Sequence, residues 1–219
     1  MRVVVIGAVL AAVLAACGTG TPSAPSAPPA PSTPTATAEP TIVMVIRHGE
    51  KPDGSAPGVD AAGKKDDSSL TATGWERAHS LVELFDPAQG PVRPGLARPT
   101  AIYAAGVTDE AEGQRTRETV TPLADALGIT GDADYGRSDE KKLVKAVVNR
   151  PGPTLISWQH GGIPDIARAF PDVTPTPPKD WPDDRFDVVW TFTKAPDGWH
   201  FAQLPELLLP QDQTAVIAS

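Results

Sequence analysis

The stretch IVMVIRHGE, Ile42 to Glu50, places an arginine and a histidine directly after a run of apolar residues. A short, continuous apolar run rich in β-branched residues is typical of a strand buried on both faces of a parallel sheet. Arg47 and His48 then stand at the carboxyl end of that strand, which is where open α/β sheets bind their ligands. The stretch therefore predicts a buried strand that ends in a cationic ligand site.

Further strands and helices alternate along the rest of the chain. Local patterning predicts strands at 42–46, 100–104, 153–158, 186–193 and 199–204, and helices at 74–85, 114–127, 139–149 and 163–170. The last two strands are separated by the turn Ala195 to Gly198, which indicates a hairpin. This order predicts an α/β fold with a mostly parallel central sheet flanked by helices and with antiparallel edge strands.

The first 17 residues, MRVVVIGAVLAAVLAAC, have the pattern of an export signal. Arg2 precedes an apolar run that is too short for a typical transmembrane helix, and small residues then lead to Cys17. This ending resembles the lipobox of bacterial lipoproteins, which implies cleavage before Cys17 and lipidation of its thiol. An ordinary secretory signal and an uncleaved anchor are the alternatives.

The remaining chain divides into a spacer and a folded domain. Residues 18–40 are rich in proline, serine, threonine and alanine and lack apolar periodicity, which predicts a disordered tether. Residues 41–219 are long enough for one domain with a full core. The expected location is extracytoplasmic, with the protein lipid-anchored to the bacterial cell membrane through Cys17. A net charge of −8 argues against nucleic acid as a partner.

A second histidine lies at the end of another predicted strand. His160 follows the strand 153–158 and, like His48, is followed by glycine, which lets a ligand approach the backbone closely. Two histidines and Arg47 at strand ends would form a cationic site in an acidic protein. Arginine binds phosphate oxygens in a bidentate manner, and histidine can act as a nucleophile or a proton donor. The sequence thus predicts a phosphate site with no metal and no cofactor.

Four sequence blocks in order resemble the histidine phosphatase superfamily, also called phosphoglycerate mutase-like. They are RHG at 47–49, LTATG at 70–74, RTRET at 115–119 and LISWQHGG at 155–162. The resemblance covers residues 41–205 and implies a phosphomonoester hydrolase that works through a phosphohistidine intermediate. It implies that His48 is the nucleophile and that Arg47, Arg115 and His160 bind the phosphoryl group. The spacing to Thr119 favours Arg115 over Arg117, which we expect on a helix face.

The general acid is not fixed by any of these blocks. Glu140 is a tentative candidate, because many members of the superfamily supply a glutamate between the arginine helix and the second histidine strand. A plain helix start, with Ser138 as the cap and acidic residues in the first turn, explains Glu140 equally well. Gly161 occupies the position at which one branch of the superfamily carries an aspartate, so that route is closed. The segment Trp181 to Trp190 is either a wall of the pocket or a structural loop.

The expected partner is a phosphorylated small molecule or a phosphoprotein. Two other functions remain open at this point. One is a phosphate-ligand binding lipoprotein with weak catalysis, and the other is a phosphotransferase or mutase of the same superfamily.

Overall fold

The computed structural model describes residues 41–107 and 113–218. The predicted signal segment, the tether and Cys17 lie outside these residues. No helix in the described ranges is both long enough and apolar enough to cross a membrane. The elements, in chain order, are β1 (Ile42–Arg47), α1 (Ala72–Phe85), β2 (Ala101–Ala104), α2 (Gln114–Leu127), α3 (Glu140–Val147), β3 (Thr154–Trp158), the 3₁₀ turn η1 (His160–Gly162), α4 (Ile163–Ala169), β4 (Val173–Thr174), β5 (Val188–Ala195) and β6 (Gly198–Pro205).

The strands form one sheet in the order β2-β3-β1-β5-β6-β4. β1 pairs in parallel with β3, which pairs in parallel with β2. β5 pairs antiparallel with both β1 and β6, while β4 pairs in parallel with β6. β5 therefore runs against the other described strands, and the mixed, mostly parallel sheet expected from the sequence is confirmed.

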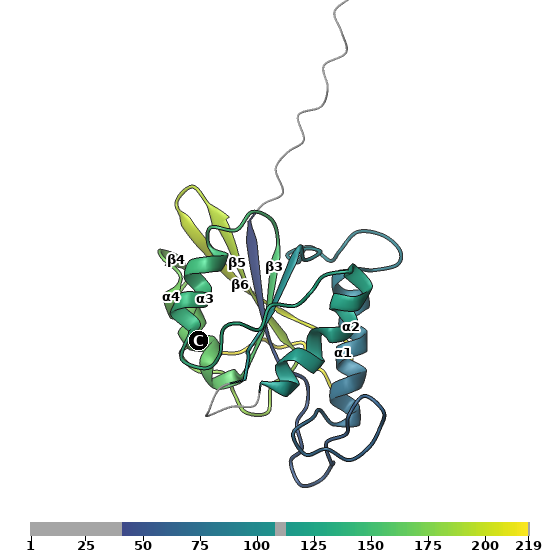
Figure 1. Cartoon of the computed structure of the whole chain (residues 1–219). Helices are drawn as coiled ribbons and strands as arrows, with labels where there is room; N and C mark the ends of the chain where they lie inside the picture. The colour runs from purple at the N-terminus through teal and green to yellow at the C-terminus, as the bar shows by residue number, and fades with distance from the viewer. Residues whose placement is uncertain (1–40, 108–112, 219) are drawn as a thin grey trace, which may run out of the picture. The chain divides into compact units, whose positions relative to one another are not determined.

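Helices cover both faces of this sheet. α1 and α2 lie on one face and α3 and α4 on the other, so the sheet is the middle of three layers (Figure 1). The apolar residues of β1 pack against both helix layers. Val43 and Val45 belong to the core cluster that includes α3 and α4, whereas Met44 and Ile46 belong to the cluster with α1 and α2. Successive side chains of a strand point to opposite faces, so both sets are buried.

The register of β1 and β3 brings the two candidate site histidines, His48 and His160, to the carboxyl ends of neighbouring strands. Arg47 is paired with Trp158, and the main-chain N–H of His48 donates to the Trp158 carbonyl at 3.0 Å. The loop after β1 also packs tightly on the start of α1. A Cβ atom at Gly74 would lie only 2.6 Å from the Glu50 carbonyl oxygen, so glycine is required for this approach.

The start of α3 differs from the sequence-based expectation. Ser138 is not the cap: it has φ 78°, in the left-handed region, and the N-cap position belongs to Asp139. The Asp139 carboxylate makes no capping bond and instead accepts from Lys142 Nζ at 2.6 Å. The prediction of a serine cap was wrong because α3 begins at Glu140, so the position before the first helical residue belongs to Asp139 and not to Ser138.

Candidate active site

The guanidinium of Arg47 is fully buried, and within the described residues it forms no ion pair with a carboxylate. Its Nη1 donates to the main-chain carbonyls of Pro182, Asp183 and Arg185, at 3.2, 2.7 and 3.0 Å. Its Nε and Nη2 are buried and have no hydrogen-bond partner in the described part of the chain. Burial lowers the pKa of Arg47 to about 10, so the group remains charged at neutral pH. Unpaired donors on a buried cation are costly and call for an anionic acceptor.

Phe186 covers this guanidinium. The Arg47 Cζ lies 3.8 Å from the centroid of the Phe186 ring, which is a cation–π contact. The same ring lies 6.1 Å from the His48 ring, centroid to centroid. Since Arg47 has no exposed surface, an anion can reach it only if the groups that cover it move, and the Phe186 ring is one of them.

His48 is held as a neutral imidazole with one free nitrogen. Its Nδ1 lies 2.7 Å from the Gly49 carbonyl oxygen, which can only accept, so Nδ1 carries the proton and Nε2 keeps its lone pair. The residue is 6% exposed. Burial, and then the charges of Arg47, Arg115 and Lys51, lower the pKa of His48 to about 3. The imidazole is therefore an available nucleophile across the whole neutral range.

α2 connects this loop to the second arginine. The Gly49 N–H donates to Thr119 Oγ1 at 2.8 Å, and that hydroxyl donates to the Arg115 carbonyl at 2.7 Å. The Arg115 side chain is half-buried and donates to the carbonyls of Ser69 and Asp67. Its charge acts on His48, whereas Arg117 is exposed and lines a separate cavity. The structure thus brings Arg115 to the site and leaves Arg117 outside it.

His160 is also at this edge of the sheet, in η1. Its Nε2 lies 2.6 Å from Asp183 Oδ1. Its Nδ1 is buried and has no partner among the described residues. Burial, followed by the charge of Arg47, lowers the pKa of His160, and Asp183 acts in the opposite direction. Arg47 therefore acts on both imidazoles.

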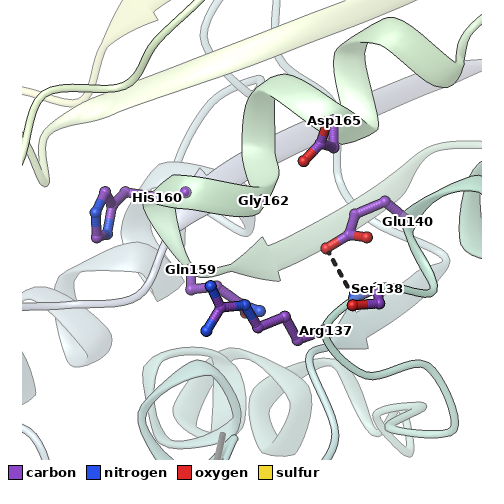
Figure 2. A pocket seen from close by; sticks show the side chains of 8 residues that line it. Arg137, Ser138, Glu140, Gln159, His160, Gly162 and Asp165 are labelled. Carbon is purple, nitrogen blue, oxygen red and sulfur yellow. Dashed lines mark hydrogen bonds between the residues drawn. The ribbon is translucent and has the colours of Figure 1, made fainter. Parts of the chain in front are cut away.

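Glu140 and His160 line a common cavity of about 550 Å³ that also includes Arg137 and Gln159. Within it, Glu140 Oε1 accepts from Trp158 Nε1 at 3.1 Å and from the Ser138 N–H at 3.4 Å. Figure 2 shows the His160 ring turned away from the Glu140 carboxylate. Glu140, the candidate general acid, lies beside η1, and its Oε1 already accepts hydrogen bonds. His48 does not line this cavity.

Two groups near the histidines were not singled out as site residues by sequence reasoning. Asp183 belongs to the segment whose role was left open, and nothing in its local pattern marks it as a partner of His160. Lys51 lies two residues after the Arg-His-Gly block, and its charge lowers the pKa of both His48 and His160. Its position after the block was the available signal. Across the described residues, no cluster of three or more histidine, cysteine, aspartate or glutamate side chains could hold a metal ion.

The arrangement suits transfer of a phosphoryl group. A neutral imidazole with a free lone pair provides the nucleophile, and the guanidinium of Arg47 provides unpaired donors for anionic oxygens. Arg115 and His160 add further positive charge or hydrogen-bond donors at the same end of the sheet.

No protein-family model matches the sequence, and no curated protein matches it significantly. Among solved structures, the chain is similar to the mycobacterial glucosyl-3-phosphoglycerate phosphatase in complex with VO3, with 12% identity over 74% of this chain and 97% of that chain and a TM-score of 0.48. It is also similar to YhfR of Bacillus stearothermophilus, with 16% identity over 74% of this chain and 95% of that chain and a TM-score of 0.46. Identities this low, with TM-scores below 0.5, leave the question of function to the site itself.

Proposed function

We propose that this protein is a phosphomonoester hydrolase of the histidine phosphatase type, with His48 as the nucleophile. The observation that carries the proposal is the pairing of two adjacent groups. Arg47 is a buried cation with two unpaired donor atoms, and His48 is a neutral imidazole whose Nδ1 is fixed by Gly49 so that Nε2 is free. A tetrahedral phosphoryl group supplies both the anionic acceptors and the electrophile that these groups require.

The reaction proceeds in two displacements at phosphorus. His48 Nε2 forms a bond to phosphorus as the bond to the ester oxygen breaks, and the departing alkoxide takes a proton from solvent water. Water then attacks the phosphohistidine, the P–N bond breaks, and inorganic phosphate is released with His48 restored. Arg47, Arg115 and His160 offset the charge that gathers on the phosphoryl oxygens. Substrate access requires the Phe186 ring to move off the guanidinium of Arg47.

The substrate is a phosphorylated small molecule or a phosphoprotein met outside the cytoplasmic membrane. This placement rests on the export signal and on Cys17 as the lipidated residue. Metabolic labelling with a radioactive fatty acid in a bacterial host tests it. The full-length chain should take up label and the Cys17→Ser variant should not; equal labelling of the two would contradict the assignment.

Turnover by the full-length chain in detergent micelles tests the chemistry. Para-nitrophenyl phosphate is the probe, inorganic phosphate release is measured between pH 4 and 8, and phosphate on the protein is trapped by rapid acid-free quenching. His48→Ala should lose at least about 10³-fold in kcat. His79→Ala, at an exposed histidine of α1, is the matched control and should keep full activity. Undiminished turnover in His48→Ala would sink the proposal.

The two other functions give different results in this assay. A phosphate-ligand binding protein would bind inorganic phosphate but show no turnover. The burial of Arg47 beneath Phe186 is the observation that favours this candidate, because a covered guanidinium suits retention of an anion better than rapid exchange. A phosphotransferase would move the phosphoryl group to an added acceptor alcohol faster than to water.

A further inference from the structure

Asp183 contacts two of the groups assigned to the phosphoryl site. Its main-chain carbonyl accepts from Arg47 Nη1 at 2.7 Å, and its side-chain Oδ1 lies 2.6 Å from His160 Nε2. These two contacts come from one residue, so the position of His160 relative to Arg47 depends on Asp183.

The contact at Nε2 decides which nitrogen of His160 faces inward. A carboxylate accepts, so Nε2 carries a proton and donates to Asp183. The other nitrogen, Nδ1, is buried without a partner in the described part of the chain. The charge of Arg47 acts on this imidazole, so the buried side of His160 belongs to the same cationic region. A phosphoryl oxygen there would accept a hydrogen bond from Nδ1 once that atom is also protonated.

The charges around His160 act in both directions on a second proton at Nδ1. The charged groups that act on His160 are Arg47, Lys51 and Arg137, which disfavour an imidazolium, and Asp183, which favours it. A bound phosphate dianion would add a second negative charge near His160, and negative charge favours the protonated imidazolium. A phosphate anion beside Nδ1 would therefore act in the same direction as Asp183 and favour uptake of a proton by His160.

Other carboxylates do not replace Asp183 in this role. Glu140 Oε1 is engaged by Trp158 and Ser138, and the His160 ring is turned away from it (Figure 2). Asp184 is exposed and has no hydrogen bond in the described chain, although its charge acts on Arg47 just as that of Asp183 does. The Asp183 side chain is itself 82% exposed, so its contact with His160 adds little to folding stability.

We propose, on the basis of the phosphatase function proposed above, that Asp183 is the positioning residue for His160. It holds Nε2 so that Nδ1 is directed at the phosphoryl group and donates to it as an imidazolium. Around metal-bound histidines, removal of such a carboxylate partner costs about 10- to 100-fold in affinity or activity, and we expect a loss of that order here.

The test compares Asp183→Asn with Asp184→Asn in the full-length chain. Both variants remove one carboxylate that acts on Arg47, but only the first removes the partner of His160. Asp183→Asn should lower kcat about 10- to 100-fold with a smaller change in KM. The upper pH limit of inorganic phosphate binding, followed by ³¹P line broadening, should move to lower pH because His160 loses its proton more easily. Asp184→Asn should match the unsubstituted protein, and Asp183→Glu should recover part of kcat.

The outcomes separate this inference from the proposed function. Loss of turnover in His48→Ala together with normal kcat and phosphate binding in Asp183→Asn would overturn the role of Asp183 alone. Faster turnover or tighter phosphate binding in Asp183→Asn would also overturn it, since Asp183 would then compete with phosphate for His160. If the protein shows no turnover, the pH dependence of phosphate binding in Asp183→Asn still decides whether Asp183 positions His160. If phosphate does not bind, both proposals fail. Unchanged urea midpoints in all three variants exclude a folding defect as the cause.

Discussion

Arg77 and Glu50 form a two-pronged ion pair directly behind the loop that carries His48. Both Nε and Nη2 of Arg77 donate to the Glu50 carboxylate, with a shortest distance of 2.7 Å. The same guanidinium is bound by Glu206 at 2.8 Å and by Asp212 at 2.7 Å. One buried cation in α1 therefore ties the loop after β1 to the segment that follows β6. These carboxylates raise the pKa of Arg77 against the effect of its burial.

Removing Arg77 should destabilise the protein strongly. Arg77→Met keeps much of the side-chain volume but leaves Glu50, Glu206 and Asp212 without their cation, two of them almost fully buried. Breaking a buried ion pair from one side costs about 3–5 kcal/mol. The free energy of unfolding in urea measures this loss. Arg98→Ala, which removes an exposed pair with Asp86, should cost less than about 1 kcal/mol. Similar losses in both variants would contradict the assignment.

Glu206 should make the protein less stable as the pH rises from about 4.5 to about 7. Burial raises the pKa of Glu206 from 4.5 to about 7, and its Oε1 is buried without a partner among the described residues. Between these pH values the folded state holds a proton that the unfolded state has lost, so the stabilising contribution is complete below pH 4.5 and lost through pH 7. A pKa raised by this much corresponds to about 3 kcal/mol.

Glu206→Gln, which does not titrate, should remove that part of the pH dependence. The measurement is the urea unfolding free energy at several pH values from 4.5 to 8. Glu76→Gln, at an exposed position of α1, is the control and should leave the slope as it is. A Glu206→Gln protein with the original slope would refute the prediction.

His48 should remain neutral under all conditions in which the protein is active. Since the pKa of His48 is lowered to about 3, its ring should stay protonated only on Nδ1 down to about pH 4. Long-range ¹H–¹⁵N spectra of the imidazole nitrogens measure this directly, with the signal assigned by its absence in His48→Gln. Activity should then show no loss from protonation of His48 above pH 4. A titration midpoint between pH 5.5 and 7 would contradict the prediction and show that the His48 ring is exposed to solvent.

Gly161 and Gly162 should respond differently to the same substitution. A Cβ atom at Gly162 would lie 2.5 Å from Trp158 Nε1 and 2.8 Å from Glu140 Oε1, whereas one at Gly161 would meet nothing within 4 Å. Gly162→Ala should therefore disturb the Trp158–Glu140 hydrogen bond and cost about 1–3 kcal/mol. Gly161→Ala should change stability by less than about 0.5 kcal/mol. Urea unfolding followed by tryptophan fluorescence checks both, and equal costs would argue against the tight packing of η1.

Local spacing in the sequence was enough to predict most of the strands and helices, though not β4, and the position of Arg115 beside His48. The apolar run before Arg47 predicted β1 because both faces of that strand are buried. The spacing of Arg115 and Thr119 reflects one helical turn, and the structure shows what it achieves: Thr119 joins the Arg115 carbonyl to the Gly49 N–H. Such relationships are encoded within a few residues of chain and are therefore visible in a pattern.

The partners of the second histidine could not be predicted in this way. Asp183 meets His160 because of the path of the chain between α4 and β5, and no periodicity specifies that path. The same holds for Glu140, whose carboxylate accepts a hydrogen bond from the indole N–H of Trp158. The sequence could not show that the Glu140 carboxylate accepts a hydrogen bond from another side chain. The two-residue strand β4 is too short to produce a pattern at all.

Arg47 is held by the main-chain carbonyls of 182, 183 and 185 rather than by side chains. Every amino acid carries a carbonyl, so a substitution at the exposed position 182 can leave its acceptor in place, whereas Arg185 is buried and paired with Asp187. The exposed side chain at position 182 can accordingly change while the guanidinium of Arg47 keeps its place. The segment is a natural choice for a mutant library aimed at new substrates.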